Sequence, residues 1–311
     1  MKKKNKIIAA VIAVVFFFIS LGLVLYPVWS SWYLDQHQAE LELQYQEQLK
    51  EKENEELLEA WAQADEYNKA IIPGTQNESA FTQEAQLKAA QNYGSMLNVN
   101  GDSIMGYVEI PKIDVDLPIY HGTEDDTLER GVGHLVGSSL PVGGESTHAI
   151  LTAHSGMASQ RMFTDLEDVA EGDVFYIKVL GETLAYQVDQ IKVVLPHEIA
   201  DLSIVLGEDY VTLITCTPYA VNTHRLLVRG TRIPYEEAEE IVEQTPVVED
   251  RVSTWEKGYL KGIVMGLVLA VILLVVLLIV YFVRKNIEKR KSKAIAATAA
   301  PEDEENNTSQ Q

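Results

Sequence analysis

The sequence predicts a mainly β protein with an N-terminal helical stalk and two transmembrane helices. Three observations support this fold class. Short segments rich in β-branched and aromatic residues follow one another from about residue 104 to residue 233. Residues 34–70 contain no Pro or Gly and are dense in Glu, Gln, Leu, Lys and Ala, as in a helix. Two long apolar runs, residues 7–26 and 263–283, lie near the chain ends.

The β region resolves into separate strands divided by turn signals. Strand character is found at residues 106–110, 115–120, 147–153, 174–179, 184–194, 211–216 and 225–229. Residues 165–169 and 201–204 predict short helices between them. Many short strands with few helices favour either a closed barrel or a sandwich.

The two apolar runs predict membrane anchors. Each is close to the ~20 residues that cross a bilayer core. Lysines precede the first run, which is long for a signal-peptide core and lacks a small-x-small cleavage site, and basic residues follow the second. By the positive-inside rule, both termini are predicted to be cytoplasmic and the β domain extracellular, which places the protein in the cell membrane.

This layout divides the chain into six predicted regions. They are a cytoplasmic tail with the first anchor at 1–33, a helical stalk and lid segment at 34–102, a β domain at 103–240, a linker at 241–262, a second anchor at 263–283 and a cytoplasmic tail at 284–311. Leu41, Tyr45 and Leu49 recur at helical spacing in the stalk. They predict an apolar stripe that docks on the β domain, with a coiled-coil dimer seam as the alternative.

Composition narrows the possible functions. The chain has 25 Lys and Arg against 46 Asp and Glu, a net charge of −21. Nucleic acid is therefore a poor partner, because its binding rests on neutralising phosphates with cations. The sequence shows neither a Gly-rich phosphate loop nor Cys–His metal spacing, so no cofactor and no metal are predicted.

The chemistry is predicted around the single cysteine, Cys216. It ends a predicted strand just before Pro218, which cannot donate to a ladder. Asn222 and Thr223 supply a turn, and the next strand begins at Arg225. This hairpin brings a thiol and a guanidinium to one edge of a sheet. A buried cysteine with only a packing role is the alternative.

A nucleophilic cysteine is activated by a nearby imidazole. Strand alternation in THAILTAHSG puts His148 and His154 on one face, and Ser155-Gly156 ends that strand, so His154 is predicted at an accessible rim. His224 is the second candidate base, although alternation points it away from Arg225. Two further histidines, His121 and His134, lie among turns and predict local hydrogen bonds.

These segments resemble one family. TLITCTPYAVNTHRLLVRG resembles the T-L-x-T-C signature and following strand of sortases. MGYVEIPKIDVDLPIYHGT and HLVGSSLPVGGESTHAILTAHSG resemble the upstream part of the same domain. With two anchors, the whole pattern is similar to class C sortases, the pilin polymerases of Gram-positive bacteria. The resemblance is dense over residues 104–233 and implies an eight-stranded β-barrel.

The resemblance also implies roles for particular residues. Cys216 would be the nucleophile, His154 the proton-transfer partner and Arg225 the substrate or oxyanion stabiliser. Thr215 would add a hydrogen bond to the oxyanion or orient Arg225. Arg229 is interpreted as a surface or structural arginine.

The predicted lid departs from the family pattern. Class C sortases usually carry an Asp-Pro-aromatic triplet in the lid, whereas this chain has Ser79-Ala80-Phe81. We expect Phe81, with Glu78, to lie near Cys216 and to cover it partly.

The activity implied is that of a membrane-anchored cysteine transpeptidase. It would cleave L-P-x-T-G-like sorting signals of pilins or surface proteins between Thr and Gly and pass the acyl group to a pilin lysine. One alternative is a sortase that attaches proteins to the cell-wall precursor. The other is a non-catalytic, membrane-tethered assembly domain with an inert cysteine.

Overall fold

The structure is a computed structural model, and it describes most of the chain. The described residues are 2–71, 92–155, 162–219, 221–244, 261–266, 268, 272, 279–287 and 290. The chain divides into two compact units, Met1–Ser253 and Thr254–Gln311. The first unit contains all the strands.

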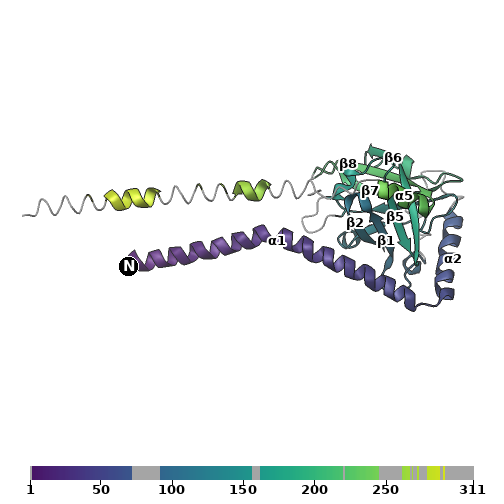
Figure 1. Ribbon diagram of the computed structural model, residues 1–311, viewed down its shortest axis with the longest axis horizontal. Helices are drawn as coiled ribbons and strands as arrows, with labels where there is room; N and C mark the ends of the chain where they lie inside the picture. Colours follow the sequence, from purple (N-terminus) through teal and green to yellow (C-terminus); the bar gives the residue numbers. More distant parts are fainter. Residues whose placement is uncertain are drawn as a thin grey trace, which may run out of the picture. The chain divides into compact units, whose positions relative to one another are not determined.

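Eight strands form a closed barrel in the order β1-β2-β3-β4-β7-β8-β6-β5. Figure 1 labels six of these strands: β1, β2, β5, β6, β7 and β8. Two neighbouring pairs, β2–β3 and β4–β7, are parallel, and the remaining neighbours are antiparallel. The strands are β1 (Ile104–Ile110), β2 (Val115–His121), β3 (Val132–His134), β4 (Thr147–Thr152), β5 (Val174–Val179), β6 (Glu182–Val194), β7 (Asp209–Thr217) and β8 (His224–Ile233).

The helices lie before, between and after the strands. The α-helices are α1 (Lys2–Glu51), α2 (Asn54–Ile71), α4 (Asp125–Leu128) and α5 (Tyr235–Gln244). The 3₁₀ helices are η3 (Tyr93–Ser95), η4 (Pro111–Ile113), η5 (Thr164–Asp168) and η6 (Ala200–Leu202). The two short helices predicted between strands correspond to η5 and η6.

The mainly β prediction is confirmed, and the structure decides for the barrel over the sandwich. All seven strands read from the sequence are present. The eighth, β3, is only three residues long and centres on Gly133, which weakens strand character in a sequence pattern. A glycine is needed there because a Cβ would lie 2.4 Å from the carbonyl oxygen of Gly122.

The barrel interior is filled by alternate residues of the strands. On β7, Val211 and Leu213 point inward and belong to the main core, as do Leu226 and Val228 on β8. The residues between them on each strand therefore face outward, because side chains alternate along a strand. This alternation decides which side chains share the outer face with Cys216.

The stalk packs on the barrel through the predicted stripe. Tyr45 and Leu49 of α1 are buried against Tyr107 and Tyr120 on the outer face of the barrel. Figure 1 shows α2 running beside the barrel. Its buried Asn68 donates to the Leu140 carbonyl at 3.1 Å and accepts from the Leu140 amide at 2.7 Å, as a paired strand residue does.

The second unit is described at only a few helical positions. Among the described residues of the whole chain, no helix combines the length and the apolar character that crossing a membrane requires. The two transmembrane helices expected at residues 7–26 and 263–283 stay predictions from the sequence.

Candidate active site

Cys216 lies near the end of β7, between β4 and β8. It is a free thiol and is partly exposed. Because β7 has a neighbouring strand on each side, groups from both neighbours can approach the sulfur.

On one side, Arg225 is the partner of Cys216 in the antiparallel β7–β8 ladder. Paired residues project to the same face of a sheet, so the guanidinium and the thiol share the outer face. Nη1 of Arg225 donates to the carbonyl oxygens of His224 at 3.0 Å and Asn222 at 3.3 Å. These two bonds hold the guanidinium beside the β7–β8 turn.

On the other side, β4 runs parallel to β7 with a constant register. Thr152 pairs with Ile214, and the Ala153 amide continues the ladder by donating to the Ile214 carbonyl at 3.1 Å. β4 ends at Thr152, and the same register continued by two residues would put His154 opposite Cys216. By register, His154 just past the end of β4 lies in one row with Cys216 of β7 and Arg225 of β8. We call this the catalytic row, after the roles that the sequence predicts for the three residues.

The catalytic row is accessible, whereas the inward-facing neighbours of Cys216 are not. Each of its three members is partly exposed. Thr215 and Thr217, on either side of Cys216, are buried at 2% and 6% exposure. A thiol, an imidazole and a guanidinium with access to solvent are the groups that nucleophilic attack, proton transfer and anion stabilisation require.

The structure shows which face Thr215 occupies and which group its hydroxyl binds. It pairs with the core residue Leu226, so it faces into the barrel, away from Arg225. Its hydroxyl donates to the Ala153 carbonyl at 2.9 Å. A hydroxyl has one proton to donate, and here that proton fixes the residue before His154. In this structure Thr215 therefore holds the segment before His154, and its role at an oxyanion or Arg225 stays a prediction.

Two residues that the sequence analysis did not single out also hold this end of the barrel. The Phe163 amide donates to the His154 carbonyl at 3.1 Å. Glu167, in η5, accepts from the Thr217 hydroxyl at 2.5 Å. Neither residue belongs to a strand or a recognisable motif, so only the closed fold reveals the two contacts.

His121 and His134, predicted to form local hydrogen bonds, also bond to residues far along the chain. Nε2 of His121 lies 2.7 Å from the Met96 carbonyl oxygen. His134 is fully buried, accepts from the Tyr93 hydroxyl at 2.7 Å and donates through Nε2 to the Ser139 carbonyl at 2.8 Å. Burial lowers the pKa of His134 to about 4, so its imidazole is neutral at physiological pH.

The other candidate base, His224, pairs with Thr217 and not with Cys216, which follows the predicted alternation. The lid residues Phe81 and Glu78 lie outside the described residues. Within the described part of the chain, no group of three or more His, Cys, Asp or Glu side chains is arranged to hold a metal ion.

The protein is a closed eight-stranded barrel with a cysteine on β7, an arginine opposite it on β8 and a histidine just past the end of β4. A family model for the sortase domain matches residues 108–233. The chain belongs to the sortase family of transpeptidases, and its structural neighbours place it in class C.

The similarity to solved class C enzymes extends beyond the barrel. Sortase C1 from Streptococcus agalactiae is 45% identical, with a TM-score of 0.58 over 63% of this chain and 98% of that chain. Streptococcus pneumoniae sortase C is 43% identical, with a TM-score of 0.55 over 63% and 97%.

Curated relatives are more distant. Sortase A of Streptococcus agalactiae serotype III is 25% identical over 159 residues, which is 46% of this chain and 63% of the relative. The chain thus matches less than two thirds of that relative's length. Sortase A of Staphylococcus aureus is 32% identical over 124 residues, 39% of this chain and 58% of the relative.

Proposed function

We propose that this protein is a membrane-anchored cysteine transpeptidase that joins pilin subunits. The acyl donor would be an L-P-x-T-G-like sorting signal and the acceptor a pilin lysine. The observation that carries this proposal is the catalytic row, in which Cys216 lies between His154 and Arg225 on the accessible outer face of the barrel.

In the proposed reaction, the Cys216 thiolate attacks the carbonyl carbon of the threonine. Arg225 stabilises the negative charge on the oxygen, and such a preorganised donor accelerates the step by about 10²–10³. His154 gives a proton to the leaving glycine amine as the C–N bond breaks. The lysine amine then attacks the thioacyl carbonyl and loses a proton to His154. Cys216 leaves as a thiolate and an isopeptide bond remains.

The similar solved structures support pilins, over other surface proteins, as the substrates. The structure of Streptococcus pneumoniae sortase C named above gives insights into pilin substrate specificity. Another similar structure, 48% identical in sequence, is sortase C1 of a pilus island. The sortase A relatives named above are 25% and 32% identical. Attachment to the cell wall is therefore the less favoured reaction for this chain.

Membrane anchoring is part of the proposal and rests on the sequence. Residues 7–26 and 263–283 have the length and apolar composition of spanning helices, with basic residues outside each. With both termini in the cytoplasm, the barrel would face the cell surface, where sorting signals are presented.

The reaction is tested by incubating the full chain, in detergent micelles, with candidate sorting peptides and lysine-bearing pilin. Mass spectrometry should find a thioester on Cys216 and then an isopeptide-linked product. A product joined to a cell-wall amine in preference to lysine would favour the alternative acceptor. Intact peptide in the presence of folded protein and both acceptors would contradict the proposal.

The topology is tested separately with protease on intact protoplasts. The protease should remove the barrel and spare tags placed at either terminus. A protected barrel, or a mature protein that lacks residues 1–26, would contradict two-anchor topology without affecting the chemistry.

A further inference from the structure

The β6–β7 connection, residues 195–208, covers part of the outer face that carries the catalytic row. Leu202 of η6 is buried against Ile150 of β4, Ile214 of β7 and Leu227 of β8. Ile214 and Leu227 each lie two residues from a member of the catalytic row, Cys216 and Arg225. The connection therefore forms a wall beside the site at which an acyl donor would bind.

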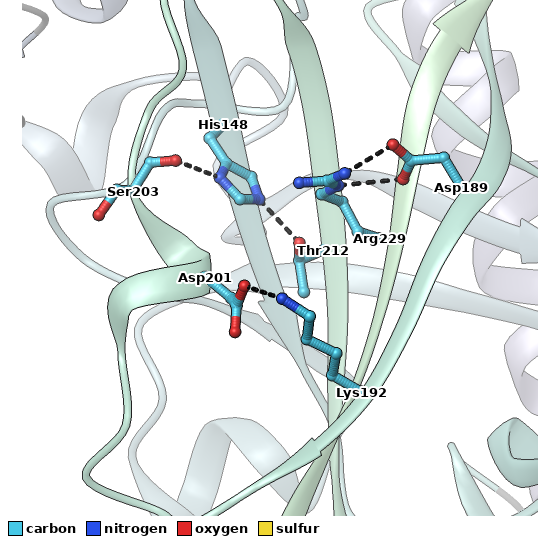
Figure 2. A network of polar contacts seen from close by, with 7 residues as sticks. All are labelled: His148, Asp189, Lys192, Asp201, Ser203, Thr212 and Arg229. Atoms are coloured by element: carbon cyan, nitrogen blue, oxygen red, sulfur yellow. Dashed lines mark hydrogen bonds and ion pairs between the residues drawn. The ribbon is translucent and has the colours of Figure 1, made fainter.

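A buried histidine fastens this wall to the barrel. His148, at 1% exposure, donates from Nδ1 to the Ser203 carbonyl at 3.0 Å (Figure 2). Its Nε2 accepts from the Thr212 hydroxyl at 2.7 Å. Both ring nitrogens are satisfied, one by the connection and the other by β7, so the imidazole joins the two.

The neutral ring is the form that makes both bonds. Nδ1 must carry a proton to donate to a carbonyl, and Nε2 must be bare to accept from a hydroxyl. Burial lowers the pKa of His148 to about 4, which keeps the ring in this form at physiological pH.

A second layer of side chains fixes the imidazole in place. Tyr210 meets the His148 ring edge-on at 5.7 Å, and the Arg229 guanidinium lies 4.2 Å above the Tyr210 ring. Asp189 holds Arg229 with two bonds of 3.0 and 2.7 Å, as Figure 2 shows. Asp189 sits at the register shift of β6 between Val188 and Gln190, and a bulge of this kind redirects a side chain.

We propose that His148 is a positioning residue for donor binding: it fixes the β6–β7 connection through Ser203 and so sets the wall beside Cys216. It does not touch the reacting atoms, because His148 and His154 are six positions apart in extended chain, a distance of roughly 20 Å. The proposal rests on the proposed transpeptidase function for its kinetic part. Its structural part concerns the connection alone.

The test compares His148→Phe with the wild type in the full chain. Phe keeps the ring volume and loses both bonds. Amide hydrogen exchange at residues 199–205 should become roughly tenfold faster, the effect of about one lost hydrogen bond, with the strands unchanged. The KM for a sorting peptide should rise about fivefold, with kcat and the alkylation rate of Cys216 by a small thiol reagent within about twofold of wild type.

Three further variants make the result specific. His148→Asn retains a donor at the δ position and should restore part of the KM. Thr212→Val removes only the hydroxyl and should shift KM in the same direction, which keeps the test available if His148→Phe does not fold. Lys192→Met is the matched control. It removes the exposed ion pair between Lys192 of β6 and Asp201 of the connection, and it should leave KM unchanged.

Several outcomes would overturn the proposal. Unchanged exchange at residues 199–205 would show that His148 does not hold the connection. Faster exchange spread over all strands, or an unchanged KM in a loosened connection, would leave His148 a structural residue only. If the wild type turns over no peptide, the proposed function fails, and the exchange comparison still decides whether His148 fixes the connection.

Discussion

Two outer faces of this barrel are built from similar strands and used in opposite ways. The face of β1, β2 and β5 is covered by α1, with the Tyr45 ring 5.3 Å from that of Tyr107. Among the described residues, the β6–β7 connection covers part of the face of β4, β7 and β8, and the last row of that face is partly exposed. In the described part of the chain, a helix closes one face, while the shorter β6–β7 connection leaves Cys216 partly exposed.

The two faces also differ in the titratable group whose neutral form burial favours. At the α1 face, the Lys178 ammonium lies 2.8 Å from Glu42 of α1, 3.0 Å from Glu109 and 2.9 Å from Asp116. Burial raises the pKa of Asp116 to about 7, although the hydrogen bond and charge of Lys178 oppose this. At the other face, burial lowers the pKa of His148 to about 4. Burial thus favours the neutral form of Asp116 at the α1 face and of His148 at the other face. Asp116 loses its proton, and with it the neutral form, as the pH rises, whereas His148 gains a proton and becomes charged as the pH falls.

The largest effect is expected from Cys216→Ala, which separates a reactive face from a merely uncovered one. The variant should lose all thioester formation and peptide cleavage, because no other thiol exists in the chain. Mass spectrometry of the protein after incubation with peptide measures this. Circular dichroism checks the fold, and cleavage by a folded Cys216→Ala protein would refute the enzyme assignment.

His154→Ala and Arg225→Ala test whether the catalytic row acts as a unit. Each should lower kcat by about 10²–10³, since one removes proton transfer and the other the anion stabiliser. The double variant should lose much less than the product of the two, because groups that serve one transition state are not additive. His224→Ala is the control and should keep kcat within about twofold. Independent, multiplying losses would mean that the three residues do not form one site.

Tyr45→Ala tests whether α1 is an integral cover of its face. Removing a fully buried aromatic side chain should lower the free energy of unfolding by about 3–5 kcal/mol. Leu43→Ala, on the same helix at 66% exposure, should cost little. Chemical denaturation measures both. Equal small effects would show that α1 contributes little to the stability of the barrel.

The pairing of Cys216 with Arg225 was predictable from the sequence because both residues obey local rules. Cys216 and Arg225 flank one hairpin, so turn chemistry alone places them together. His154 required the end of a strand and the family resemblance, since the parallel register between β4 and β7 joins residues 62 positions apart. Alternation also put His148 on the face of His154.

The remaining features depend on long-range packing that a local pattern does not encode. β3 is too short to show a period. The partner of His148 is a backbone carbonyl of residue 203, and a carbonyl group leaves no sequence signal. Thr215 faces inward because the closed barrel decides which residues of β7 line its interior. The helix α5 is amphipathic and packs Ala238, Ile241 and Val242 on β5 and β6, but the sequence analysis did not single it out.

The smallest effect is expected from Asp116→Asn, which sharpens the contrast between the faces. Because the folded-state pKa of Asp116 is raised, its contribution to stability is fully present below the unfolded value near 3.9 and is lost as pH rises through about 7. The wild type should therefore lose stability at this site between pH 5 and pH 8, and the Asn variant should not. The difference should be about 1 kcal/mol, since a third of the side chain is exposed and solvent screens its charge.

Urea denaturation at pH 5 and pH 8 measures this difference in stability. Asp201→Asn, at the exposed pair with Lys192, is the control and should leave the pH dependence unchanged. An identical pH dependence in wild type and Asp116→Asn would show that the α1 face does not hold a proton at Asp116.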